Sequence, residues 1–144
     1  MNIYLDNCCF NRPFDDQSQI RIRLETEAKL HIQAAILDGK FGLIWSYILD
    51  YENSRNPFPE RRNQIAKWRT EAIHDVEESD QLLSIASRIL RCGIKKLDAL
   101  HIACAISVKA DYFVTTDDGI LKKADCIEEI KITDPIGFIK EIAV

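Results

Sequence analysis

The sequence predicts an α/β fold with a mostly parallel central sheet. Short apolar segments with the residue types of β-strands alternate with longer segments of helical periodicity. Turn-forming Gly, Pro and Asp residues lie between these segments. Such alternation is typical of parallel sheets, because the chain must cross back over the sheet between parallel strands. The length of 144 residues is that of one domain, so we expect residues 1–144 to form a single unit.

The first third of the chain predicts a strand, a loop and a long helix. Residues 2–5 are apolar or β-prone, and the strand that they predict ends at Asp6. Pro13 and the turn formers that follow it predict a loop. From about residue 18 to residue 38 apolar residues recur at every fourth position, namely Ile20, Leu24, Ala28 and Ile32. This period predicts a helix that ends at Gly39.

The middle of the chain predicts a second strand over residues 41–45, followed by three helices. The first covers residues 46–53 and the second covers residues 59–72. The third begins after a cap at Ser79 or Asp80, has one apolar face, and ends at Gly93.

The last third predicts two more strands and three more helices. An apolar helix over residues 96–109 precedes a strand over residues 112–115. The turn at residues 116–119 leads into a short helix, and residues 129–132 form a candidate last strand. The final helix would start with Asp134 as its cap and Pro135 at its first position.

Composition narrows the classes of function. The net charge of −4 argues against a general nucleic-acid coat, whose binding depends on Lys and Arg. It is compatible with a nuclease, because clustered carboxylates keep a site acidic until metal ions bind. The five cysteines are odd in number and include no C-x-x-C pair, so we predict no disulfide framework or zinc cage and a cytoplasmic location. We expect no export signal and no membrane span, because the longest apolar run is short.

Four acidic residues lie where ligands bind in parallel α/β sheets, which is outside the carboxyl ends of the strands. Asp6 and Asp117 directly follow predicted strands, and Glu52 lies one helix beyond the second strand. Asp98 lies in the first turn of an apolar helix, three residues before His101, so these two side chains can meet on one face. Each acid alone is an ordinary turn, cap or surface residue, but the ordered set indicates a shared site.

Converging carboxylates are ligands for hard divalent cations such as Mg²⁺ and Mn²⁺. These cations neutralise phosphate charge, lower the pKa of a bound water and stabilise in-line displacement at phosphorus. Without metal the carboxylates repel one another, which raises some of their pKa values. The set is therefore suited to hydrolysis of a phosphodiester.

Four segments, in order and over nearly the whole chain, resemble the motifs of the PIN-domain family. They are Ile3-Tyr4-Leu5-Asp6-Asn7, Ser46 with Glu52 six positions later, Leu97-Asp98-Ala99-Leu100-His101-Ile102-Ala103, and Phe113-Val114-Thr115-Thr116-Asp117. The resemblance implies a three-layer α/β/α sandwich and a ribonuclease that depends on Mg²⁺ or Mn²⁺. Many small members are toxins of toxin–antitoxin pairs and form dimers. The partners it implies are thus RNA, an antitoxin protein and a second copy of the chain.

By this resemblance Asp6, Glu52, Asp98 and Asp117 would hold the metal and act in catalysis. The candidate supporting residues are Asn7, Ser46, Asp50, His101, Thr115 and Asp118. Asp50 competes with Glu52 for the second acidic position; the two are two positions apart and point in different directions on a helix. Asn11 and Arg12 lie in an unusual segment after the first acid, where they could contact a phosphate or shape the loop.

The sequence is also compatible with other classes of protein. A haloacid-dehalogenase-like phosphatase would need a second Asp two residues after Asp6, where this chain has Cys8. A receiver domain would need paired acids before its first helix. A Cys–His hydrolase would use Cys8 or Cys9 with His101, and a Ser–His–Asp hydrolase is a further alternative. A non-catalytic PIN-like binding or scaffold protein would be expected to lack some of the four acids.

Two groups of basic residues could guide RNA, or could be solvated helix faces. One lies within residues 55–69 and the other within residues 88–96. We expect Trp45 and Trp68 to belong to the core or to an interface rather than to stack on bases.

Overall fold

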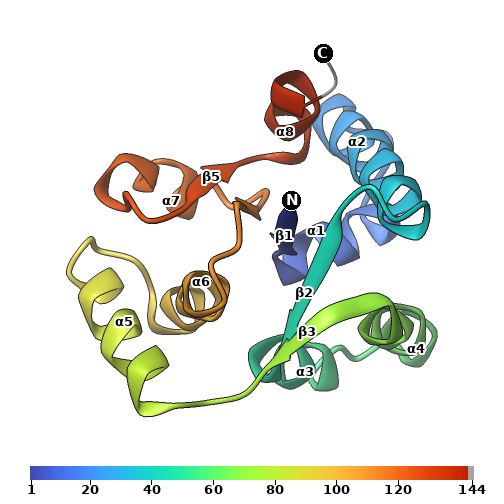
Figure 1. Cartoon of the computed structure of the whole chain (residues 1–144). Coiled ribbons are helices and arrows are strands. Elements are labelled where there is room, and N and C mark those ends of the chain that lie inside the picture. Colours follow the sequence, from blue (N-terminus) through green and yellow to red (C-terminus); the bar gives the residue numbers. More distant parts are fainter. Residues whose placement is uncertain (143–144) are drawn as a thin grey trace.

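Figure 1 shows the computed structural model of the chain, which describes residues 1–142. Its centre is a five-stranded sheet in the order β3-β2-β1-β4-β5, and every neighbouring pair is parallel. The strands are β1 Asn2–Leu5, β2 Gly42–Ser46, β3 Ala72–Val76, β4 Tyr112–Val114 and β5 Lys131–Thr133. The predicted parallel α/β fold is confirmed.

Helices cover both faces of the sheet and make three layers. Figure 1 shows α2 and α8 on one side of the sheet and α5 and α6 on the other. The α-helices are α1 Asn7–Asn11, α2 Ile20–Leu37, α3 Tyr47–Ser54, α4 Pro59–Ala66, α5 Asp80–Leu90, α6 Lys96–Ser107, α7 Asp118–Leu121 and α8 Pro135–Ile142. Short 3₁₀ helices are η1 Arg12–Phe14, η2 Lys67–Glu71 and η3 Ala124–Cys126. No helix within residues 1–142 is both long and apolar enough to cross a membrane.

The central strand β1 is buried on both faces, and its register aligns the ends of three strands. Tyr4 pairs with Phe113 across β1 and β4, and their rings stack with centroids 5.3 Å apart. Leu5 pairs with Val114 in the same register. Because parallel strands end at the same edge of the sheet, the residues after β1 and β4 emerge beside Ser46 at the end of β2. This edge holds the candidate site.

Strand β3 was not predicted, and the helix expected over residues 59–72 is shorter than expected. The α-helix ends at Ala66, and residues 67–71 form the 3₁₀ helix η2. β3 is an edge strand in which Ile73, His74 and Asp75 are exposed. An edge strand with little burial lacks the alternation of apolar and polar residues that identifies a strand in sequence.

The segment after Asp6 was predicted as a loop but contains the short helix α1. The Asp6 carboxylate caps this helix by accepting a hydrogen bond from the backbone N–H of Asn7. Helix α2 was predicted correctly, but Ile20 and Leu24 of its expected apolar stripe are exposed. Instead the helix buries Glu25, which forms an ion pair with Arg12. The buried face of α2 therefore differs from the apolar stripe that the sequence predicts.

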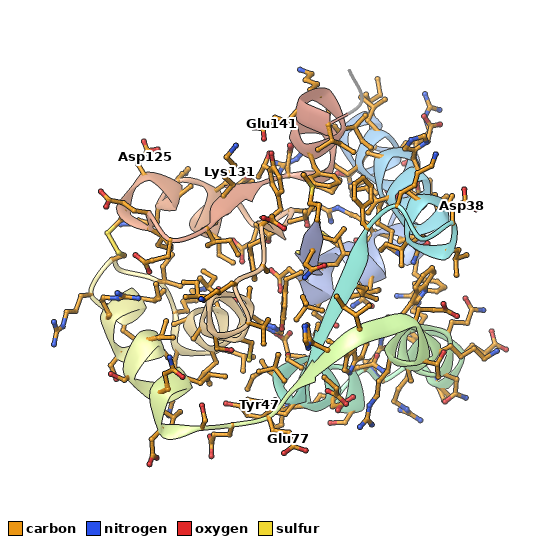
Figure 2. The ribbon with its side chains drawn as sticks, in the orientation of Figure 1. Asp38, Tyr47, Glu77, Asp125, Lys131 and Glu141 are labelled. Atoms are coloured by element: carbon orange, nitrogen blue, oxygen red, sulfur yellow. A yellow bond between two sulfur atoms is a disulfide. The ribbon has the colours of Figure 1, made fainter. Side chains whose placement is uncertain are left out.

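A disulfide joins Cys92 and Cys126, contrary to the expectation from the cysteine count. Figure 2 shows it as a yellow bond. The two residues are 34 positions apart, and their Cα atoms lie 5.9 Å apart because the end of α5 meets η3. Such a pair arises from tertiary structure, and spacing alone does not reveal it. The remaining cysteines Cys8, Cys9 and Cys104 are free.

Candidate metal centre

Asp6 is fixed at the end of β1 by three neighbours. The residue is 4% exposed, and its Oδ2 accepts a hydrogen bond of 2.8 Å from the Thr115 hydroxyl. Oδ1 accepts from the backbone N–H of Asn7 at 2.8 Å, and the Cys8 thiol lies 3.5 Å from Oδ2. Thr115 follows β4, so this hydrogen bond links the ends of the two neighbouring strands. The carboxylate is therefore held in one orientation before any ligand binds.

Glu52 on α3 and His101 on α6 meet beside Asp6. The imidazole Nε2 of His101 forms a short hydrogen bond with Oε1 of Glu52 and lies 3.9 Å from Oδ1 of Asp6. Among residues 1–142, these three side chains are the ones that could offer metal-ligand atoms all within 4.8 Å of one another. Helices α3 and α6 thus converge on the end of β1.

A buried chain of hydrogen bonds runs from His101 into the core. Nδ1 of His101 lies 2.5 Å from the Tyr4 hydroxyl, which lies 2.6 Å from the Ser46 hydroxyl. Ser46 in turn accepts a hydrogen bond from the backbone N–H of Leu49. Every group is paired if Ser46 donates to Tyr4, Tyr4 donates to Nδ1, and Nε2–H donates to Glu52. In this tautomer both ring nitrogens of His101 are engaged, one with Tyr4 and the other with Glu52.

Asp98 lies half-buried in the first turn of α6, close to the other acids. Burial and the negative charges of Asp6, Asp117 and Glu52 raise the pKa of Asp98 to about 6, while His101 acts in the opposite direction. Asp98 lies outside the tighter group of Asp6, Glu52 and His101. Its carboxylate nevertheless experiences the charge of all three other acids, which is the electrostatic signature of a shared anionic site.

Asp117 occupies the exposed side of the site. It caps α7, and its Oδ1 accepts a hydrogen bond of 2.8 Å from the backbone N–H of Gly119. Its own backbone N–H donates to the Thr115 hydroxyl at 3.1 Å. Thr115 therefore connects Asp117 to Asp6, with its hydroxyl donating to one residue and accepting from the other.

The pattern of ion pairs separates these four acids from their neighbours. Within residues 1–142, no Lys or Arg forms an ion pair with Asp6, Glu52, Asp98 or Asp117. Asp50 accepts from the indole N–H of Trp45 at 2.8 Å and pairs with Arg69 at 3.8 Å. Asp118 accepts two hydrogen bonds from the guanidinium of Arg21, at 2.8 and 2.9 Å. Asp50 and Asp118 thus each pair with an arginine, whereas none of the four acids does.

Asn7 supplies a further oxygen at the site. Its amide nitrogen lies 3.2 Å from Oε2 of Glu52, to which it donates a hydrogen bond. Its Oδ1 is buried and has no hydrogen-bond partner among the described residues. A buried amide oxygen without a donor is unfavourable, and a cation or a cation-bound water would satisfy it. The donor set around Asp6 therefore fits a hard divalent ion.

Asn11 and Arg12 are engaged in structural contacts instead of facing open solvent. Asn11 donates to the backbone carbonyl of Asn7 at 3.0 Å and accepts from Asn56 at 3.2 Å. Arg12 pairs with the fully buried Glu25 at 3.0 Å and with Asp15 at 3.0 Å. The structure thus places both residues in the packing between α1, η1 and α2.

The fold is similar to that of a solved structure, described as VapBC2 from Rickettsia felis bound to a DNA fragment from their promoter. The match has a TM-score of 0.58, covers 93% of this chain and 98% of that chain, and has 14% sequence identity. At this identity the likeness concerns the fold. No protein-family model matches the chain, and no curated protein matches it in sequence.

The arrangement of the thiols and hydroxyls does not suit a nucleophile activated by His101. Cys9 is fully buried, its thiol contacts the carbonyl of Val114, and burial raises its pKa well above the usual value. The hydroxyl of the buried Ser46 is bonded to Tyr4. Both nitrogens of His101 are bonded to Tyr4 and Glu52, so none is directed at a cysteine.

Proposed function

We propose that the chain is a metal-dependent endoribonuclease of the PIN type. The observation that carries the proposal is the cluster of four acids, none of which pairs with a Lys or Arg within residues 1–142, at the carboxyl edge of β1, β2 and β4. The resemblance of the four sequence motifs and the likeness to the VapBC2 fold support the same conclusion. Asp6, Glu52, Asp98 and Asp117 would hold Mg²⁺ or Mn²⁺, with Asn7 as a further oxygen donor.

Different residues at this site would bind the cation and hold its carboxylate ligands in position. When bound, the cation supplies charge neutralisation for the phosphodiester and a water of lowered pKa for hydrolysis. Thr115 holds the Asp6 carboxylate in place by its hydrogen bond. His101 holds Glu52, and Tyr4 holds the tautomer of His101. Fixed carboxylates lose little freedom when a ligand binds, which favours tight and directed binding.

The direct test is cleavage of a labelled RNA with Mg²⁺ or Mn²⁺, with and without EDTA. We expect cleavage that EDTA abolishes and that falls at least about a hundredfold in Asp6→Asn and Asp98→Asn, because each variant removes a ligand charge. Asp50→Asn is the matched control; its amide oxygen can still accept from Trp45. Cleavage that is insensitive to EDTA, or equal in all four proteins, would contradict the proposal.

A role as the toxin of a toxin–antitoxin pair is the finer part of the proposal. It is motivated by the family resemblance and supported by the fold likeness to VapBC2. Expression of the wild type should stop growth of a bacterial host, and expression of Asp98→Asn should leave growth unchanged. An antitoxin protein and a homodimer are the partners proposed on the same basis. Unchanged growth with the wild type would contradict the toxin role. It would not contradict the nuclease activity, which the cleavage assay tests separately.

The proposed location is the cytoplasm. The cytoplasm is a reducing compartment in which most cysteines stay as thiols. We therefore expect the Cys92–Cys126 disulfide to be reduced there and to form after the protein is exposed to oxidising conditions. Alkylation of the thiols in intact cells tests this location. Five alkylated cysteines would agree with the cytoplasm, and three would contradict it.

A further inference from the structure

A groove of about 620 Å³ adjoins the candidate metal centre. Helix α3 forms one wall with Tyr47, Tyr51 and Arg55, and the start of α6 forms the other with Lys96 and apolar residues. Glu52 also lines the groove, so one end of this space borders the acidic cluster. Figure 2 shows Tyr47 at the start of α3, near the end of β3. A molecule that fills the groove would therefore contact the site directly.

The aromatic wall of the groove is accessible and already carries a cation. Tyr51 is 48% exposed, although most large apolar rings of this chain are buried. The guanidinium of Arg55 lies 5.6 Å from the centre of the Tyr51 ring, and its Nη1 donates a hydrogen bond of 2.7 Å to the Tyr51 hydroxyl. This contact holds the ring and the planar guanidinium together at the rim. Nucleobases stack on tyrosine rings and on planar guanidinium groups.

The basic residues of the two walls have no acidic partners. Within residues 1–142, neither Arg55 nor Lys96 forms an ion pair. Their charges are therefore available to a ligand, as those of the carboxylate-paired Arg12, Arg21, Arg69 and Arg88 are not. Two unpaired cations on opposite sides of an aromatic groove are complementary to a base with a phosphate on each side. An acid also lies near this wall, because the Tyr47 hydroxyl donates to Glu78 at 3.5 Å, but Glu78 pairs with neither Arg55 nor Lys96.

We infer that this groove holds one unpaired base of the RNA strand, next to the phosphate at the acidic cluster. The base stacks on the Tyr51–Arg55 pair, and Lys96 contacts the backbone phosphate on the other wall. The position of the cleaved phosphate rests on the proposed function, but the stacking does not. Because a base inside a duplex is already stacked on its neighbours, the groove selects single-stranded segments.

Binding can be measured without cleavage, which separates this inference from the proposed activity. A fluorescent nine-nucleotide RNA is titrated with the protein in Ca²⁺, and fluorescence anisotropy is recorded. We expect Tyr51→Ala to weaken binding about tenfold, because stacking on one aromatic ring contributes a factor of this size. Tyr51→Phe should bind within about twofold of the wild type, since it keeps the ring. Replacing one nucleotide by an abasic one should cause the same loss in the wild type and little further loss in Tyr51→Ala.

Phe58→Ala is the matched control for loss of an exposed ring. Phe58 is 51% exposed and has Arg61 above its ring at 4.1 Å, but it does not line the groove. Equal affinities of the wild type, Tyr51→Ala and Phe58→Ala would overturn the inference, as would an RNA duplex that binds as well as the single strand. A change of oligomeric state in Tyr51→Ala with unchanged RNA affinity would instead assign the groove to a protein contact. Failure of the proposed function would appear separately, as absence of EDTA-sensitive cleavage.

Discussion

At the scale of single residues, Asp98 is the acid whose charge is least favourable in the metal-free protein. Its pKa of about 6, against the ordinary 3.8, means that the folded state binds more protons than the unfolded state between these values. Stability therefore falls as the pH rises from about 4 to about 6 and stays lower above that range. The half-exposed position reduces the effect, which we expect to be about 1 kcal/mol at neutral pH.

Asp98→Asn should thus be more stable than the wild type in EDTA at pH 7, by about 1 kcal/mol in the free energy of unfolding. The difference should disappear near pH 4, where the carboxyl group of the wild type is protonated. Urea unfolding at both pH values measures it. Asp50→Asn should show no gain, because it removes a carboxylate that pairs with Arg69. An Asp98→Asn variant that is less stable at pH 7 would contradict this account of the site.

Tyr4 is the residue of the site that sequence reasoning missed. In the sequence it is an aromatic residue in a core strand, and nothing local indicates that its hydroxyl reaches His101 and Ser46. Tyr4→Phe leaves both partners without this hydrogen bond inside the core. We expect a loss of about 1–3 kcal/mol in the free energy of unfolding. Because Glu52 is then less well oriented, we also expect about tenfold weaker Mn²⁺ binding.

Tyr112→Phe is a suitable control for the loss of a tyrosine hydroxyl. The Tyr112 hydroxyl bonds to Glu141, remote from the site. Calorimetric titration with Mn²⁺ and urea unfolding compare the two variants. If both bind Mn²⁺ equally, the hydrogen-bond chain has no positioning role.

Local context was enough to mark Asp6, Asp98 and Asp117 as candidates, since each lies at a strand end or in the first turn of a helix. The choice between Glu52 and Asp50 could not be made from sequence, because it depends on tertiary contacts of Asp50 with Trp45 and Arg69. The structure engages Asp50 with these two partners and brings Glu52 beside Asp6 and His101.

At the scale of elements, helix α2 contains a buried lysine. Lys29 is 3% exposed and lies over the ring of Phe10, and within residues 1–142 it forms no ion pair. Burial lowers the pKa of Lys29 from 10.5 to about 8. Below pH 8 the folded protein therefore carries a poorly solvated charge, which lowers its free energy of unfolding. This loss of stability disappears as the pH rises from about 8 to about 10.5, because the folded protein releases the proton before the unfolded chain does.

Lys29→Met should raise the free energy of unfolding by about 2–3 kcal/mol at pH 7. The gain should shrink as the pH approaches 10, because the wild-type amine is then neutral in the folded state. Chemical unfolding at pH 7 and pH 10 measures the difference between the two proteins. A gain that does not depend on pH would mean that packing, and not charge, explains it.

The strands buried in the sheet were predicted most closely from sequence, and the edge strand β5 at Lys131–Thr133 overlaps the expected strand at residues 129–132. Residues 2–5, 41–45 and 112–115 are apolar because both of their faces are covered, and each lies within one or two residues of an observed strand. β3 has no such signal, because its exposed edge carries His74 and Asp75. The burial of Glu25 and Lys29 in α2 depends on partners in other elements, so the helix was predictable and its inner face was not.

At the scale of the whole molecule, the disulfide closes a loop that contains half of the candidate site. The segment between Cys92 and Cys126 includes α6 and β4, and with them Asp98, His101 and Asp117. A closed loop of this length stabilises a fold by up to about 3–4 kcal/mol through the unfolded state. Reduction should lower the free energy of unfolding by up to that amount, and should leave a Cys92→Ser/Cys126→Ser variant unaffected.

Thiol titration of the denatured protein provides the control for this prediction. Without reductant the wild type should expose three thiols, those of the free cysteines Cys8, Cys9 and Cys104. Five reactive thiols together with no effect of reductant on unfolding would contradict the disulfide.

The fold as a whole gathers carboxylates from α3, α6 and the segments after β1 and β4. It pairs the neighbouring Asp50 and Asp118 with arginines, but within residues 1–142 it pairs none of these four acids with a Lys or Arg. That difference gives the account its central claim, that the cluster is a divalent-metal site. Calorimetric titration of Mn²⁺ into the wild type, Asp6→Asn, Asp98→Asn and Asp50→Asn tests it most directly. We predict that the wild type and Asp50→Asn bind alike and that the other two bind at least about tenfold more weakly. Equal binding by all four proteins, or no binding by the wild type, would contradict the claim.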